Sequence, residues 1–232
     1  MKLVKIEKMV NKLIPSWVGQ KHIPSIIRQL NKTFVKSIIY FSSERYVDKF
    51  YKDHSVIVSG QYCPRILSAI PENIQIILAF PKKSKKAIIN AKCANNLAIK
   101  IIRAIHHEYR HKHQQRGRGY VYTKQYNTKK GEKDRLRLHY YGNPDELDAH
   151  AYETQAEKLD INRLRIAHRI DWRESEAVFM YRKHFRERDP KIWQRFLKKV
   201  YKNNECPTGN QKSRSDCTNA EKGKRHSRKI KR

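Results

Sequence analysis

The sequence predicts an α+β protein in which helices dominate, and three observations support this fold class. Residues 55–60 and 74–80 are short runs rich in β-branched side chains, which are typical of strands. Residues 84–115 place apolar side chains at steps of three and four, which indicates one long amphipathic helix. Two later pairs, Asn143-Pro144 and Asp189-Pro190, have the composition of helix starts.

The 232 residues are enough to bury a core, and they divide by composition into three regions. Residues 1–50 form a predicted N-terminal helical region with breaks at Pro15 and Pro24. Residues 51–202 form the predicted main domain, which contains the strands, the long helix and the C-terminal helices. Residues 203–232 are polar, lack aromatic side chains and end in KGKRHSRKIKR, so we expect this tail to be disordered.

The segment after the long helix differs from its neighbours. Residues 116–144 are basic, punctuated by glycine and rich in tyrosine, and the alternation in YVYTKQY and RLRLHYY predicts a hairpin or β-ribbon. A helix then starts with Asn143 as N-cap and Pro144 at the first helical position, and we expect it to reach about Leu159. Two further helices are predicted in residues 171–185 and 189–202.

The formal net charge is +30, from 52 basic and 22 acidic residues, so the protein should attract polyanions such as DNA or RNA. Charge alone gives non-specific affinity and names no target. In the sequence RGRGYVYTKQY, Arg116 and Arg118 are candidates to contact phosphates, and Tyr120 and Tyr122 are candidates to stack on bases. The alternative is a solvated hairpin whose tyrosines pack on its own strands.

The N-terminus predicts a protein without a secretory signal. Residues 1–15 carry apolar side chains at helical spacing with lysines between them, rather than an unbroken apolar core. No stretch approaches the ~18 consecutive apolar residues that a membrane span needs. We therefore expect no membrane span and a cytoplasmic protein, located in the host cytoplasm or the virion if the gene is viral. The sequence carries no indication of oligomeric state.

The most informative motif is His107-Glu108-Tyr109-Arg110-His111, which reads H-E-x-x-H. Residues four apart share a helix face, so both imidazoles can bind one metal ion while Glu108 reaches a water on it. Zn²⁺ lowers the pKa of such a water, and a carboxylate takes its proton. About 0.03 chance occurrences are expected in this chain. The alternative is a pair of surface histidines, but both lie more than a quarter of a turn from the centre of the apolar stripe, so they face solvent or a cleft.

A third metal ligand is expected from the helix in residues 142–153. The acidic residues near its start are Asp145, Glu146 and Asp148. Acids are common in a first helical turn because they oppose the helix dipole, and this explains Asp145. Glu146 shares a helix face with His150 and with Glu153, and we prefer it as the ligand. Asp148 remains the alternative third ligand.

The sequence HEYRH followed by NPDELDAHA resembles zinc metallopeptidases of the gluzincin type, over roughly residues 95–160. It is also similar to small metallopeptidases encoded by phages and bacteria. The resemblance implies that His107, His111 and Glu146 bind Zn²⁺ and that Glu108 is the general base. It further implies that residues 51–202 adopt a zincin-like fold, with a small sheet beside the H-E-x-x-H helix.

From these observations we expect an enzyme, a zinc-dependent metallopeptidase that hydrolyses peptide bonds of a protein or peptide substrate, acting near nucleic acid. A metal-activated water attacks the carbonyl, Glu108 accepts its proton, and a nearby donor stabilises the oxyanion. The candidate donors are Tyr140, Tyr141, Tyr152 and His150. The alternative is a basic nucleic-acid-binding or virion structural protein with a non-catalytic metal site.

Overall fold

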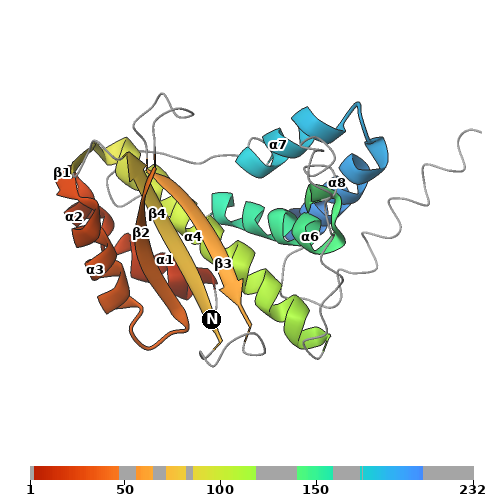
Figure 1. Ribbon diagram of the computed structural model, residues 1–232. Coiled ribbons are helices and arrows are strands. Elements are labelled where there is room, and N and C mark those ends of the chain that lie inside the picture. The colour runs from red at the N-terminus through yellow and green to blue at the C-terminus, as the bar shows by residue number, and fades with distance from the viewer. Residues whose placement is uncertain are drawn as a thin grey trace, which may run out of the picture.

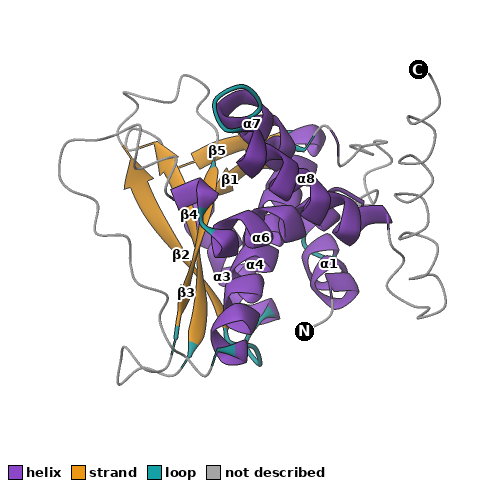
Figure 2. Ribbon diagram, turned by 90° about the vertical axis from the view of Figure 1, so that its right-hand side faces the viewer, coloured by secondary structure: helices purple, strands orange, loops and turns teal. Residues whose placement is uncertain are grey.

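The computed structural model confirms a mixed α+β architecture, mostly helical, with a small three-stranded sheet (Figure 1). It describes residues 3–46, 56–64, 72–81, 86–118, 140–158, 173 and 175–205. Figure 2 shows the strands on one side of the molecule and most of the helices on the other. Within the described residues, no helix is long and apolar enough to cross a membrane.

The N-terminal region contains the predicted helices, and it also contains two strands. The helices are α1 (Leu3–Asn11), α2 (Ile14–Trp17) and α3 (Ile23–Thr33), and the strands are β1 (Gly19–His22) and β2 (Ile39–Tyr46). The side-chain amide of Asn31 in α3 donates to the carbonyl of Phe41 (2.9 Å) and accepts from its N–H (2.7 Å). Asn31 thus satisfies backbone groups of β2, which lies at the edge of the sheet.

The two predicted strands are present as β3 (Ile57–Cys63) and β4 (Asn73–Pro81). The central strand β4 pairs in parallel with β2 and antiparallel with β3. A separate two-stranded sheet joins β1 to β5 (Lys86–Ile89). Strand β2 of the predicted N-terminal region therefore belongs to the same sheet as β3 and β4 of the predicted main domain.

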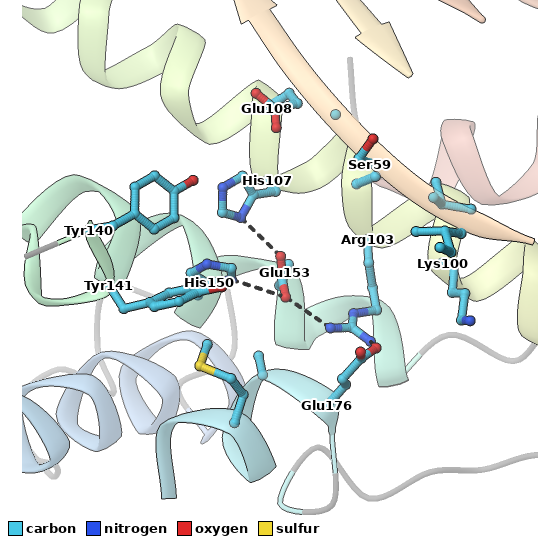
Figure 3. Close-up of a pocket in the computed structure, with 16 residues that line it drawn as sticks. Ser59, Lys100, Arg103, His107, Glu108, Tyr140, Tyr141, His150, Glu153 and Glu176 are labelled. Carbon is cyan, nitrogen blue, oxygen red and sulfur yellow. Dashed lines mark hydrogen bonds and ion pairs between the residues drawn. The ribbon is translucent and has the colours of Figure 1, made fainter. Parts of the chain in front are cut away.

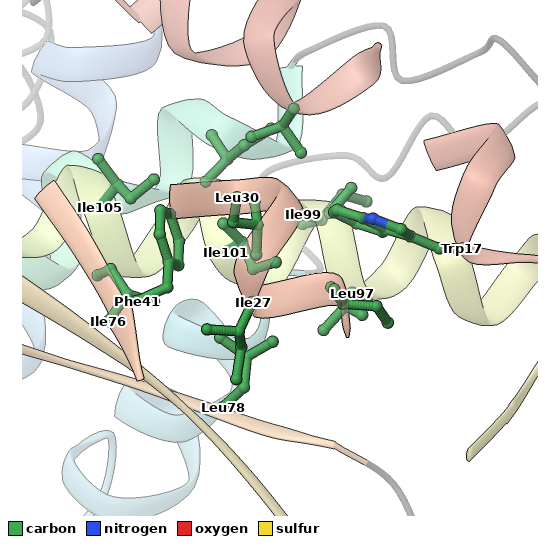
Figure 4. Close-up of a cluster of buried hydrophobic side chains, with 14 of the residues drawn as sticks. Trp17, Ile27, Leu30, Phe41, Ile76, Leu78, Leu97, Ile99, Ile101 and Ile105 are labelled. Carbon is green, nitrogen blue, oxygen red and sulfur yellow. The ribbon is translucent and has the colours of Figure 1, made fainter. Parts of the chain in front are cut away.

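The long helix is α4 (Ala91–Gly117), which starts later than the predicted residue 84. Residues 86–89 form β5 instead, and the side chain of Asn90 then caps the helix by accepting a hydrogen bond from the N–H of Cys93 at 2.8 Å. The apolar stripe of α4 packs with α1–α3 and the sheet in one hydrophobic cluster, part of which is drawn in Figure 4.

The C-terminal helices are α6 (Pro144–Glu153), a 3₁₀ turn η3 (Thr154–Lys158), α7 (Glu176–Phe185) and α8 (Pro190–Glu205). The predicted cap is confirmed, because the Asn143 side chain accepts from the N–H of Asp145 at 2.9 Å. These helices form a second hydrophobic cluster around Leu147, Tyr181 and Phe196. Helix α8 continues to residue 205, while most of the predicted ribbon (119–139) and tail (206–232) lie outside the described residues.

Candidate metal centre

Helix α4 places the two histidines of the motif on one face, as their spacing predicts. The Nε2 atoms of His107 and His111 lie 3.0 Å apart. His107 is buried, with 8% of its surface exposed, and His111 is half-buried. Both Nε2 atoms face helix α6, and each histidine lines a cleft beside that helix instead of open solvent.

Helix α6 brings Glu146 to both imidazoles. One carboxylate oxygen of Glu146 lies 3.4 Å from Nε2 of His107, and the other lies 3.4 Å from Nε2 of His111. Glu146 lies in the first turn of α6, after the Asn143 cap, and its contacts show that this turn faces α4. The three predicted ligands of the preferred set therefore converge.

The alternative ligand Asp148 points elsewhere. Its carboxylate accepts hydrogen bonds from Arg110 (2.5 Å), Gln114 (3.1 Å) and Lys199 (2.6 Å). These contacts join α4, α6 and α8. Asp148 thus acts as a structural anchor beside the centre, and Glu146 is the carboxylate that faces the two histidines.

His150 is a further potential ligand that the sequence singled out only as an oxyanion donor. Ligand atoms of His107, Glu146 and His150 lie within 4.8 Å of one another, close enough to hold one metal ion. Among the described residues, Nε2 of His150 and one oxygen of Glu146 are buried without a hydrogen-bond partner. Buried polar atoms without partners are costly, so these atoms fit a cation. The four-residue spacing from Glu146 to His150 is the signal that points to this role.

A second layer of polar contacts orients His107 (Figure 3). Its Nδ1 atom lies 3.0 Å from a carboxylate oxygen of Glu153, and the other oxygen accepts from Arg103 at 2.9 Å. Arg103 in turn contacts Glu176 at 3.0 Å, and His150 lies 3.4 Å from Glu153. Such a carboxylate fixes which ring nitrogen of the histidine carries the proton, leaving Nε2 free to bind a metal.

The electrostatics of the centre favour a positive charge. Burial alone would lower the pKa of His107, but the adjacent carboxylates of Glu146 and Glu153 outweigh it and raise that pKa to about 10. Burial alone would raise the pKa of Glu146, but contacts with His107 and His111 hold it well below its usual range. The same carboxylates that favour a proton on His107 would favour a bound cation.

Glu108 lies next to the histidines, against strand β3. It is buried, with 6% of its surface exposed, and this burial raises the pKa of its carboxyl group despite the nearby His107 and His111. The absence of a side chain at Gly60 makes room for it, because a Cβ there would lie 2.6 Å from Cγ of Glu108 and 2.8 Å from Oε1. Strand β3 therefore sets the position of the predicted base.

The centre opens on both sides of Glu108. A cleft of about 570 Å³ extends between β3, α4, α6 and α7, and a second of about 270 Å³ extends toward the end of α4. Gly60, Glu108 and Tyr140 line both. Although 51% of Tyr140 is exposed, burial of its hydroxyl and the nearby carboxylate of Glu146 raise the pKa of that hydroxyl. An extended chain that crosses the centre would pass these three residues.

Two of the four predicted nucleic-acid contacts, Arg116 and Arg118, form ion pairs within the chain. Arg116 forms an ion pair with Glu72 at 2.6 Å, and Arg118 pairs with Asp145. Their charges are thus compensated within the chain, which does not support them as phosphate contacts. Tyr120 and Tyr122 lie outside the described residues.

Comparison with known proteins gives no match: no family model, curated protein or solved structure is significantly similar to the chain. The resemblance to gluzincins therefore stays a prediction that rests on the motifs alone.

Proposed function

We propose that this protein is a zinc-dependent metallopeptidase in which His107, His111 and Glu146 bind the metal and Glu108 is the general base. The observation that carries this proposal is the position of Glu146, whose two carboxylate oxygens each lie 3.4 Å from one of the two Nε2 atoms. Two helices that are separate in sequence thus supply a set of two nitrogen ligands and one oxygen ligand around one point.

The donor set fits zinc better than the other common divalent cations. Mg²⁺ and Ca²⁺ prefer all-oxygen sites, whereas Zn²⁺ accepts imidazole nitrogen together with carboxylate oxygen. Three protein ligands also leave the open position that a catalytic zinc needs. Glu153 supports the set because it contacts the Nδ1 atom of His107, which frees Nε2 for the metal.

The residues around the metal can each perform one step of peptide hydrolysis. When bound, the cation would lower the pKa of a water molecule and polarise the scissile carbonyl. Glu108 is placed to accept the proton of the attacking water and to pass it to the leaving amine, and its burial favours the proton-bound state between these steps. The hydroxyl of Tyr140 is the best-placed donor for the oxyanion, because it reaches the centre from the wall shared by both clefts.

One observation favours a second candidate, a non-catalytic metal site. His150 groups with His107 and Glu146, so it offers a fourth protein ligand. Four protein ligands close the coordination sphere of zinc, as in structural sites, and leave no position for water. In the peptidase, by contrast, His150 contacts Glu153 and leaves the fourth position open.

Zinc content and hydrolysis of labelled casein, measured together, test both candidates. The peptidase predicts one equivalent of zinc in the wild type and in Glu108→Gln, loss of zinc in His107→Ala, and hydrolysis by the wild type only. In that case His150→Ala keeps its zinc. A wild type that binds zinc and shows no hydrolysis, together with a His150→Ala variant that loses zinc, would instead support the structural site. Wild-type protein without zinc would contradict both.

A further inference from the structure

We propose that the outer face of helix α8 is a nucleic-acid-binding surface that contacts the phosphate backbone through Lys191, Arg195, Lys198 and Lys202. This function is independent of the proposed peptidase. Helices α7 and α8 lie at the end of the molecule opposite α2 and α3, and Figure 2 views this end from outside. All four side chains are exposed.

The four residues form a line because of their spacing. They follow one another at steps of four, three and four residues, which at 3.6 residues per turn keeps them within about 60° of arc. The line extends about 16 Å along the helix axis, at a rise of about 1.5 Å per residue. Regular positive charges along such a length match a regular polyanion.

The opposite face of α8 is the one that holds the helix in the fold. Phe196 and Val200 belong to the second hydrophobic cluster, with Phe196 stacked on Tyr181 at 3.9 Å between ring centroids. Lys199, which lies outside the basic line, forms an ion pair with Asp148 at 2.6 Å. The helix thus uses one face for packing and presents the other to solvent.

The charges of the line are uncompensated. Within the described residues, none of the four basic side chains forms a salt bridge, in contrast to Arg116 and Arg118. Helix α8 contains no acidic residue between Pro190 and Asn204. The preceding connection contains Arg186 and Arg188 together with Glu187 and Asp189, so it adds no net charge. Helix α8 therefore presents a line of positive charge on its solvent-exposed face.

The chemistry of this face favours nucleic acid over a membrane. An interfacial membrane helix places large apolar side chains on the face that enters the lipid. In α8 the apolar residues Phe196 and Val200 face the core, and the basic line contains no apolar side chain. Lysine and arginine that contact phosphates without reading bases give affinity that depends on salt and little on sequence.

The test compares two variants of the full chain that carry the same net charge. The surface variant is Lys191→Gln/Arg195→Gln/Lys198→Gln/Lys202→Gln, and the control variant is Lys5→Gln/Lys8→Gln/Lys32→Gln/Lys36→Gln, which changes exposed lysines on α1, on α3 and just after α3. Each lowers the formal charge from +30 to +26, that is 30 − 4. Affinity for a 20-base-pair duplex DNA is measured against salt concentration, because basic residues elsewhere, such as those in 206–232, add a background.

We expect the surface variant to reduce the slope of log affinity against log salt by about 3 to 4, and the control variant to change it by less than about 1. The charge-retaining variant Lys191→Arg/Arg195→Lys/Lys198→Arg/Lys202→Arg should bind as the wild type does, which separates charge from folding. Equal slopes for the surface and control variants would overturn the proposal. So would a surface variant that keeps its DNA affinity while losing binding to phosphatidylserine vesicles.

Discussion

Glu153 lies 3.0 Å from Nδ1 of His107, on the opposite side of the imidazole ring from the Nε2 atom that faces Glu146. The carboxylate is buried and is held from behind by Arg103 at 2.9 Å. In the proposed metal centre, this relationship makes Glu153 a positioning residue, since it would fix the orientation and the proton of the proposed ligand His107 without binding the metal itself.

Glu153→Gln should therefore weaken zinc binding by about 10- to 100-fold, as loss of a partner of a metal-binding histidine typically does. Affinity is measured by competition with a chromophoric chelator. The matched control is Glu176→Gln, which removes the other carboxylate partner of Arg103 but does not touch His107. Equal zinc affinity in Glu153→Gln and wild type would rule out this positioning role.

Glu146 and Asp148 should differ sharply in their effect on metal content, although they are two residues apart on one helix. Glu146→Gln removes the charge of the proposed carboxylate ligand, and we expect the purified variant to contain little zinc. Asp148→Asn should retain a full equivalent, because Asp148 binds Arg110 and Lys199 instead. Metal analysis of the two variants gives the answer directly. Zinc loss in Asp148→Asn with retention in Glu146→Gln would reverse the assignment.

Asp148 should instead affect stability and its pH dependence. Burial would raise the pKa of Asp148, but hydrogen bonds from Arg110 and Lys199 outweigh it and lower that pKa. A lowered folded-state pKa gives stability that is fully present above the unfolded-state value of about 3.9 and is lost as the pH falls through the folded-state pKa. Metal-free Asp148→Asn should be less stable than metal-free wild type by about 1–3 kcal/mol at pH 6. Denaturant unfolding between pH 6 and pH 3 should show this difference shrinking with acid, and a constant difference would contradict the assignment.

Gly60→Ala should displace the base without removing it. The added Cβ would lie 2.6 Å from Cγ of Glu108, so the carboxylate must shift. Because small misplacements of reacting groups are costly, we expect kcat for labelled peptide to fall about 10- to 100-fold with zinc retained. Gly117→Ala is the control, since nothing lies within 4 Å of a Cβ there. Full activity in Gly60→Ala would mean that Glu108 is not held by this strand.

Tyr140→Phe should lower kcat on the order of 100-fold with little change in KM, because the hydroxyl would act on the oxyanion rather than on the bound substrate. Tyr141→Phe is the matched control, since Tyr141 lines the larger cleft beside His150 without lining the smaller one. Steady-state kinetics of the two variants and of the wild type distinguish them. A rise in KM alone for Tyr140→Phe would assign the hydroxyl to substrate binding.

The sequence predicts those helices and contacts that depend on residues only a few positions apart. Asn143-Pro144 marks the start of α6 because an amide cap and a proline act on the first turn alone. The H-E-x-x-H spacing likewise requires only helical geometry to bring His107 and His111 together. Strand β2 was not predicted because its partner β4 lies more than 30 residues away in the chain. The strand in residues 86–89 was not predicted because its partner β1 lies more than 60 residues away.

The choice between Glu146 and Asp148 depended on a contact that local sequence does not contain. Lys199 lies 51 residues after Asp148, and its ion pair, with that of Arg110, turns this carboxylate away from the histidines. Arg116 and Arg118 behave similarly, because Glu72 and Asp145 neutralise them across large separations in the chain. By contrast, the spacing of His150 and Glu153, four and seven residues after Glu146, is visible in the sequence. The residues that His150 and Glu153 contact on other helices are not.

The two hydrophobic clusters meet at α4 and α6 through an interface built largely of histidines, carboxylates and arginines. Because polar side chains form much of this contact, an ion bound by residues of both helices would cross-link two separately packed halves. A bound ion would stabilise the folded contact between the two halves by a free energy of RT ln(1 + [L]/Kd), where L is the metal ion. Chelation would then loosen the bundle first, exposing α6–α8 to proteases while the sheet and its helices stay folded.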